Sequence, residues 1–141
     1  MTENQQKLLQ KMYTEQRLAE SNLALLQQRL EVVQAYTTNY RAGLAVLKEL
    51  EGKEEGEEVL MNVGGSIFVQ ANLVNPGTVT RGIGSGVRIE QSVVDATKEV
   101  EDALSKLEKQ SEELSEQYNK IAVISQTLSA QIQQLAEQMQ Q

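Results

Sequence analysis

The sequence lacks cysteine, histidine and tryptophan altogether, and it has only one proline and one phenylalanine. Without cysteine there is no disulfide framework, which fits a reducing compartment such as the cytoplasm. Cysteine and histidine are also the commonest transition-metal ligands and frequent partners in nucleophilic catalysis. The absences are consistent with a cytoplasmic protein and give no support for a transition-metal site or for a nucleophile with a base beside it. We expect a protein that is not an enzyme and has no cofactor.

Large apolar side chains are scarce as well, since aromatic residues make up 4% of the 141 residues. Glutamine, glutamate, leucine, alanine and lysine dominate outside the middle of the chain, which is typical of long helices. Such a chain cannot build a large core of its own. We therefore expect its apolar surface to be buried along a seam between helices or against other chains.

The charge balance is acidic, with a formal net charge of -7 and a sequence pI of about 4.7. The chain has no basic stripe to neutralise phosphates, which argues against nucleic acid as a partner. A helix at a membrane surface would need a basic polar face, and no run of 18 apolar residues could cross a bilayer. The first residues, MTENQQ, lack the apolar segment of a secretion signal. We expect no membrane association.

Two long segments, residues 3–51 and 93–139, carry apolar residues in alternating steps of three and four, which predicts two coiled-coil helices. The spacing of Thr2 and Gln5 suits a capping box at the start of the first helix. Ser92 and Asp95 have the same spacing before the second, and Gly52 suits a C-terminal cap of the first. The first seam consists of Leu9, Met12, Gln16, Ala19, Leu23, Leu26, Leu30, Val33, Thr37, Tyr40, Leu44 and Leu47. The second consists of Val100, Leu104, Leu107, Ser111, Leu114, Tyr118, Ile121, Ser125, Leu128, Ile132, Leu135 and Met139.

The middle of the chain changes character and predicts two successive β-hairpins. An acidic loop at residues 51–58 is followed by four short strand-like runs, at residues 59–63, 67–71, 78–81 and 87–90. Asn75-Pro76-Gly77 forms the turn between the hairpins. The glycines expected to adopt positive φ in the hairpin turns are Gly64, Gly65, Gly84 and Gly86. We thus divide the chain into an N-terminal helix (1–51), a loop with two hairpins (52–91) and a C-terminal helix (92–141).

The hairpins must return the chain so that the second helix runs antiparallel to the first, with Leu47 near Ala96. Isolated hairpins are marginal in water, and their free edges invite pairing with other chains. The predicted fold class is α+β, mainly α: a long antiparallel two-helix coiled coil with two central β-hairpins that assemble into an oligomeric β-barrel. The residues expected to mediate oligomerisation are Val59, Met61, Val63, Ile67, Phe68, Val69, Val79, Ile83, Val87 and Ile89.

The order helix, two hairpins, helix resembles the α class of subunits in the prefoldin family. The most specific stretches are "VLMNVGGSIFVQANL", residues 59–73, and "RGIGSGVRIEQSVVDA", residues 81–96. The resemblance covers nearly the whole chain, and two hairpins rather than one distinguish the α class from the β class.

The resemblance implies a hexamer of two α-class and four β-class subunits. The hairpins would form a double barrel from which six coiled coils hang. It further implies capture of unfolded client proteins at the coiled-coil ends without ATP, and their transfer to a group II chaperonin.

Client contacts are expected at the end of the coiled coil where the two termini meet. The last turns of helices fray because they lack partners, which would leave apolar side chains partly exposed. Methionine adapts to many shapes, and the surrounding glutamines are polar without charge. The alternative for each residue is ordinary packing that closes the coil. The expected client-binding residues, called the tip residues below, are Leu8, Leu9, Met12, Leu128, Ile132, Leu135 and Met139.

A second apolar row lies one step from the first seam, at Leu18, Leu25, Val32 and Val46, and is called the flank strip below. It either widens the seam or, at Leu18, Leu25 and Val32, forms a strip that faces the cavity enclosed by the coiled coils.

Two short motifs resemble ligand-binding loops, but their surroundings favour a turn and a solvated loop instead. The run GIGSG at residues 82–86 is followed by a strand-like segment and lacks a Walker lysine, so a hairpin turn is favoured over a phosphate loop. The acidic run at residues 54–58 lacks the ligand spacing of an EF-hand, so a solvated loop is favoured over a calcium site.

The alternative overall function is a structural scaffold that assembles through its hairpins without binding clients.

Overall fold

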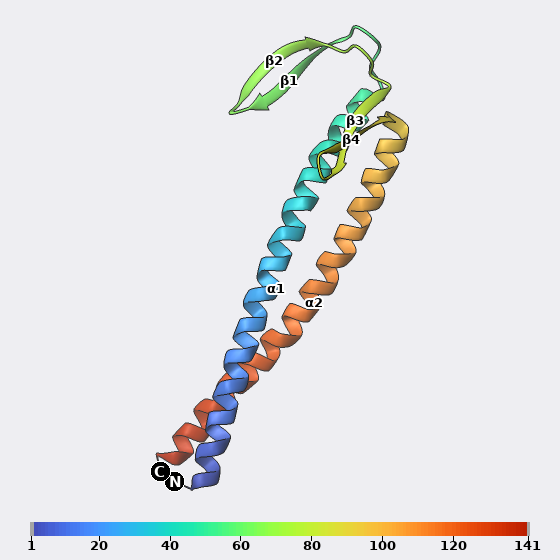
Figure 1. Cartoon of the computed structure of the whole chain (residues 1–141). Helices are drawn as coiled ribbons and strands as arrows, with labels where there is room; N and C mark the ends of the chain where they lie inside the picture. The colour runs from blue at the N-terminus through green and yellow to red at the C-terminus, as the bar shows by residue number, and fades with distance from the viewer. Residues whose placement is uncertain (1, 141) are drawn as a thin grey trace. The chain divides into compact units, whose positions relative to one another are not determined.

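The structure, a computed structural model, describes residues 2–140; Met1 and Gln141, which end the expected segments, lie outside the described residues. In sequence order, one long helix comes before four strands and a second long helix follows them. Each pair of consecutive strands forms its own two-stranded antiparallel sheet (Figure 1). The predicted fold, mainly α with two central hairpins, is confirmed. In chain order the elements are α1 (Glu3–Leu50), β1 (Glu58–Gly64), β2 (Ile67–Asn72), β3 (Thr78–Gly84), β4 (Val87–Ser92) and α2 (Val93–Met139).

Both helices begin at the capping residues that the sequence predicts. The main-chain N–H of Gln5 donates to Thr2 Oγ1 and that of Thr2 donates to Gln5 Oε1, both at 3.2 Å, which completes a capping box. At α2 the N–H of Asp95 donates to Ser92 Oγ at 3.1 Å. Each contact satisfies an amide that the first helical turn leaves without a partner.

The predicted cap at Gly52 is wrong. α1 ends at Leu50, and Gly52 is not among the residues with positive φ, so it does not form the left-handed cap that favours glycine. The chain leaves the helix through three-residue turns instead, with the N–H of Gly52 donating to the carbonyl of Glu49 and that of Lys53 to Leu50. A helix end of this kind does not require glycine at position 52, because the residue there does not adopt positive φ.

The helices pack along the predicted seams in two compact units, which we describe separately. One unit contains the chain up to Tyr36 and from Leu107 onward. Its buried residues are Met12, Ala19, Leu26, Leu128 and Ile132.

The other unit contains Thr37–Lys106, including both hairpins. Its core joins the end of α1 to the start of α2, so the predicted proximity of Leu47 and Ala96 is confirmed. The core residues are Leu47, Val93, Ala96, Val100 and Leu104, against which Tyr40, Leu44, Leu50 and Val79 pack.

The two hairpins repeat the same architecture 20 residues apart. Glu58 pairs with Asn72 in the first and Thr78 with Ser92 in the second, and each has a bulge just before its turn. The turn residues Gly65 and Ser66 have φ of 59° and 60°, and their counterparts Ser85 and Gly86 have 51° and 76°. Positive φ at both central residues is typical of type I′ turns, which match the twist of hairpin strands.

The remaining two glycines of the expected turns, Gly64 and Gly84, have φ of 103° and 112° and lie at the bulges. Between the hairpins, Asn75 Oδ1 accepts from the N–H of Gly77 at 3.1 Å, which forms the predicted turn.

Candidate interaction surfaces

One face of the β1–β2 hairpin is apolar, half-buried at Val59 and Ala71 and exposed towards the turn. Cross-strand pairs in an antiparallel sheet share a face, and residues two apart along a strand do so too. Val59 pairs with Ala71 and Met61 with Val69, and Ile67 lies two residues before Val69. We call these five residues the hairpin face. Met61, Ile67 and Val69 are each about half exposed or more, at 52%, 61% and 47%.

The opposite side of the same hairpin is mixed. Leu60 pairs with Gln70 and Asn62 pairs with Phe68. Leu60 and Phe68 are also exposed, as is Val63 in the bulge. Apolar groups on both sides of a two-stranded sheet favour burial by another chain, because water solvates them poorly.

The β3–β4 hairpin lies against its own chain. Val79 packs against the helical core, and Arg81, Ile89 and Gln91 on the same face are half-buried. The outer side of the turn, with Ile83 and Val87, remains exposed. The two hairpins therefore differ: one covers helices of its own chain, and the other leaves its apolar face free.

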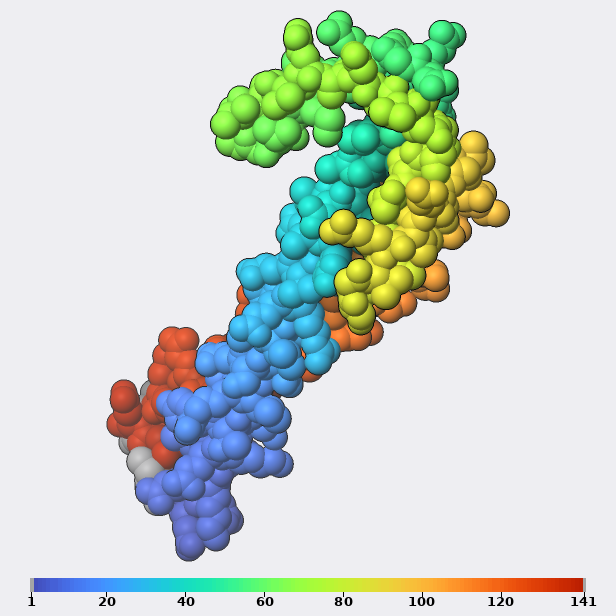
Figure 2. Space-filling model, turned by 45° about the horizontal axis from the view of Figure 1, so that its top comes forward, coloured from blue at the N-terminus to red at the C-terminus, as the bar shows by residue number. Residues whose placement is uncertain are grey.

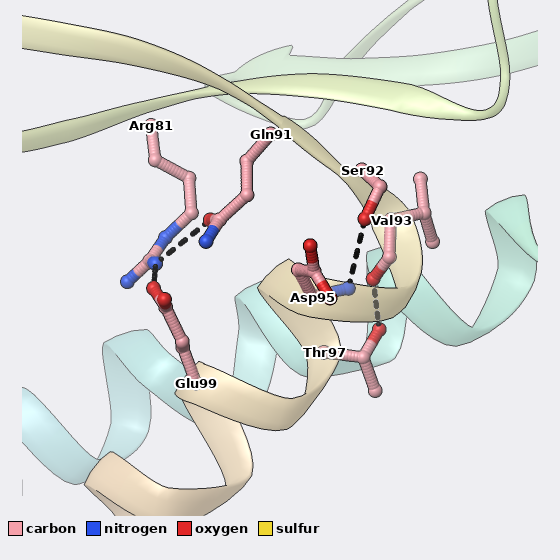
Figure 3. A network of polar contacts seen from close by, with 7 residues as sticks. All are labelled: Arg81, Gln91, Ser92, Val93, Asp95, Thr97 and Glu99. Carbon is pink, nitrogen blue, oxygen red and sulfur yellow. Dashed lines mark hydrogen bonds and ion pairs between the residues drawn. The ribbon is translucent and has the colours of Figure 1, made fainter.

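A polar cluster joins the β3–β4 hairpin to α2 (Figure 3). Arg81 donates to the Gln91 side-chain oxygen at 3.0 Å and forms an ion pair with the Glu99 carboxylate. Hydrogen bonds from the Gln91 side chain and from Arg81 lower the pKa of Glu99 below its ordinary value. These contacts fix the hairpin on the first turns of α2.

The cluster predicts a pH-dependent contribution to stability. Because the pKa of Glu99 is lower in the folded chain than in the unfolded chain, its contribution is present above the ordinary glutamate pKa and disappears as the pH falls through the folded pKa. We expect wild type to melt above Glu99→Gln at pH 7 and the two to converge at low pH. Thermal melts at several pH values, with Glu101→Gln as an exposed control, measure this. A constant difference at all pH values would contradict the prediction. The carboxylate is half exposed, so the effect is small and falls with salt.

The tip residues do not share one environment. Met12, Leu128 and Ile132 are buried between the helices, so in this conformation they pack the coil. Leu9, Leu135 and Met139 are half-buried, and Leu8 is exposed. Figure 2 shows the first turns of α1 (blue) and the last turns of α2 (red) side by side.

A groove of about 460 Å³ lies between these helix ends. Leu8, Met12, Leu128 and Leu135 form its apolar part. The polar part consists of Lys11 and Glu15 from α1 and Gln131, Gln134 and Gln138 from α2. The groove has the chemistry of a shallow apolar binding site with a polar rim. Only Met12, Leu128 and Leu135 among its lining residues belong to the heptad seams; Leu8 and all the polar residues come from outside them.

A polar layer interrupts the seam next to this groove. Gln16 Nε2 lies 2.8 Å from Ser129 Oγ and 3.2 Å from Ser125 Oγ, while Gln16 Oε1 is buried without a hydrogen-bond partner. Turning the amide by 180° would only exchange which of its two atoms lacks a partner. A single polar layer of this kind fixes the register of a coiled coil and lowers its stability.

Replacing Gln16 with leucine should therefore stabilise the chain. The substitution removes a buried unsatisfied oxygen, while Ser129 is exposed and Ser125 is half-buried, so their hydroxyls reach water. We expect a gain of about 1 kcal/mol in the free energy of unfolding, measured by denaturation followed by circular dichroism. Gln10→Leu, at an exposed position on α1, is the control and should change stability much less. A loss of stability in Gln16→Leu would contradict this reading.

The flank strip does not widen the seam. Leu18 is 62% exposed whereas its neighbour Ala19 in the seam is 6% exposed, and Leu25 beside Leu26 repeats the contrast. Val32 and Val46 are also more than half exposed. The strip is thus an apolar surface without a partner among the described residues.

Other kinds of site find no support in the part of the chain that the structure describes. Strand β4 follows the GIGSG run, so no helix opens at the glycines. Residues 2–140 contain no group of three or more acidic side chains placed to hold a metal ion. Neither helix is apolar enough over a sufficient length to cross a membrane.

Sequence reasoning missed the Arg81 cluster. It placed uncharged glutamines around the tip residues, but it did not single out the three that line one groove, Gln131, Gln134 and Gln138. The cluster was detectable from the 20-residue repeat, since Arg81 stands where the first hairpin has apolar Met61. The row of glutamines was detectable from spacing, because Gln131, Gln134 and Gln138 recur at three and four residues and so share a helix face.

The comparisons with known proteins agree on one family, prefoldin. The family model for prefoldin subunits matches residues 19–138. The chain is 33% identical over 84 residues to prefoldin subunit alpha of Archaeoglobus fulgidus, which covers 60% of this chain and 61% of that relative. It is 31% identical over 112 residues to prefoldin subunit alpha of Methanobrevibacter smithii, covering 79% and 76%. The first match thus spans less than two thirds of the relative's length.

Two solved structures share the fold. A filamentous PFD from Methanocaldococcus jannaschii, determined by cryo-EM, superposes with a TM-score of 0.65 at 24% identity, covering 83% of this chain and 97% of the other. The prefoldin beta subunit of Thermococcus strain KS-1 superposes with a TM-score of 0.60 at 20% identity, covering 90% of each chain.

Proposed function

Since this chain belongs to the prefoldin family as an α-class subunit, we propose that it is part of an ATP-independent chaperone that holds unfolded proteins in the cytoplasm and delivers them to a group II chaperonin. The observation that carries the proposal is the open groove between the helix ends, whose apolar part includes the exposed Leu8 and the half-buried Leu135. Such a groove suits apolar segments that a folded protein would bury.

Assembly would use the hairpins. The exposed hairpin face of β1–β2 supports contact with other subunits, in a hexamer of two α-class and four β-class chains. Val59, Met61, Ile67 and Val69 would lie in that contact, and Ile83 and Val87 would extend it from the second hairpin. Val79 and Ile89, half-buried in their own chain, would act by supporting the second hairpin. Prefoldin-type proteins also include a filamentous one, so the native mass distinguishes a closed hexamer from an open array.

Client binding would be shared among subunits. One shallow groove binds weakly, but several linked grooves raise the overall affinity by effective concentration. Leu8, Leu9, Leu135 and Met139 would contact clients directly, whereas Met12, Leu128 and Ile132 would do so when the helix ends open. The exposed flank strip at Leu18, Leu25 and Val32 would add a second apolar contact facing the client.

An aggregation assay tests the proposal. The assembled full-length protein should keep a chemically denatured client soluble at near-stoichiometric ratio without ATP. A chain lacking residues 1–12 and 128–141 should assemble with the same number of subunits yet protect far less. A second variant carries the groove substitutions Leu8→Ser and Leu135→Ser, which remove apolar contact without shortening either helix, and it should also lose protection.

The competing function is a structural scaffold, which the burial of Met12, Leu128 and Ile132 within the coil favours. A scaffold would assemble through the same hairpins. Equal protection by the truncated and the full-length assemblies would show that clients do not bind in the groove. Absence of protection by the full-length assembly would favour the scaffold.

A further inference from the structure

The polar rim of the groove carries no net charge. Lys11 and Glu15 are one helical turn apart on α1, so their opposite charges compensate each other within the rim. The remaining polar groups are the carboxamides of Gln131, Gln134 and Gln138. The groove therefore complements an uncharged occupant, and its specificity must come from hydrogen bonding and apolar contact.

The three glutamines form a row on one face of α2. Their spacing of three and four residues brings them onto the same side of the helix, over about 10 Å of its length. An extended peptide advances about 3.3 Å per residue, so the row spans about three residues of such a peptide. All three side chains are exposed, and none has a hydrogen bond with another described residue.

A carboxamide offers one acceptor and two donors, the same kinds of group as a main-chain peptide unit. Unfolded segments differ from folded ones in having main-chain groups that are not already paired. We propose that Gln131, Gln134 and Gln138 bind the main chain of an extended apolar segment whose side chains contact Leu8, Met12 and Leu135. The inference rests on the proposed function and names the occupant: an uncharged, extended stretch of unfolded protein, recognised through its peptide groups rather than its sequence.

The row would then explain how one groove accepts many sequences and still rejects folded surfaces. Apolar contact alone would accept an amphipathic helix equally well, since a helix satisfies its own main-chain groups. Hydrogen bonding to free peptide groups would favour the extended segment. The helix is thus the alternative occupant that an experiment has to exclude.

Two peptides of identical apolar sequence provide the test, one of them N-methylated at alternate main-chain amides to remove donors. Binding of each is measured by fluorescence anisotropy to the assembled full-length complex. For wild type we expect N-methylation to weaken binding about tenfold, as the loss of a few hydrogen bonds would. The variant Gln131→Met/Gln134→Met/Gln138→Met keeps side-chain length without the amides, and the same modification should weaken its binding less than twofold.

Gln133→Met is the matched control, because Gln133 bonds to Glu137 on the same helix and does not line the groove. It should discriminate between the peptides as wild type does. Equal discrimination by the triple variant and wild type would overturn the inference, as would wild type binding both peptides equally. If wild type protects a denatured client but shows no discrimination, the inference alone fails. If it neither protects nor binds either peptide, the proposed function fails with it.

Discussion

Replacing Met61 with lysine and Val69 with glutamate is expected to release single chains from the assembled complex. The two residues pair across β1 and β2 on the hairpin face and are each about half exposed. An opposite-charge pair supports a hairpin about as well as an apolar one, so the strands should stay paired. The apolar surface available to a neighbouring subunit would be lost, and two charges would have to be desolvated on contact. Native mass spectrometry or light scattering measures the change, and circular dichroism shows that the helices persist.

The matched control is Leu60→Lys with Gln70→Glu, which introduces the same charges at a pair on the other side of the hairpin. We expect it to weaken assembly less, because that side already carries polar groups. If both double variants retain the native mass, the β1–β2 hairpin is not the assembly surface. If only the control dissociates, the interface lies on the opposite side from the one we infer.

Ala96→Asp should unfold the unit that contains the hairpins. Ala96 has no exposed surface and is enclosed by Leu47, Val93, Val100 and Leu104. A carboxylate there has neither solvent nor a cation within the cluster, and burying an unpaired charge costs about 3 kcal/mol or more. The expected result is a large drop in melting temperature, with early loss of the helical signal.

Val94→Asp provides the comparison, two residues earlier on the same helix and 72% exposed. A carboxylate in the first turn of a helix is favourable, and exposed substitutions usually change stability by no more than about 0.5 kcal/mol. A similar melting temperature for both variants would show that Ala96 is not in a tightly packed core.

The helical part of the fold was predictable because its information is local. Alternating three- and four-residue steps identify which side of each helix is buried, and Ser92 or Thr2 marks where a helix begins. The end of α1 was not predictable in the same way. Glycine at position 52 permits a left-handed residue without requiring one, and the neighbouring turn hydrogen bonds determine the outcome.

The candidate surfaces were only partly predictable, because exposure depends on tertiary packing. The hairpins have similar β patterns, yet Val79 packs on helices whereas Met61 stays exposed. Likewise Met12 and Leu8 are both apolar residues near the start of α1, but only Met12 lies at the seam and is buried. A sequence pattern identifies apolar residues, whereas the geometry of the partner helix decides which of them remain available.

The start of α1 and the end of α2 belong to the same compact unit, and both line the groove. An affinity tag or fluorescent fusion attached at either terminus would therefore sit beside the groove and compete for it. Recombinant preparations are best compared after protease removal of any tag, or with the label carried by a different subunit of the complex.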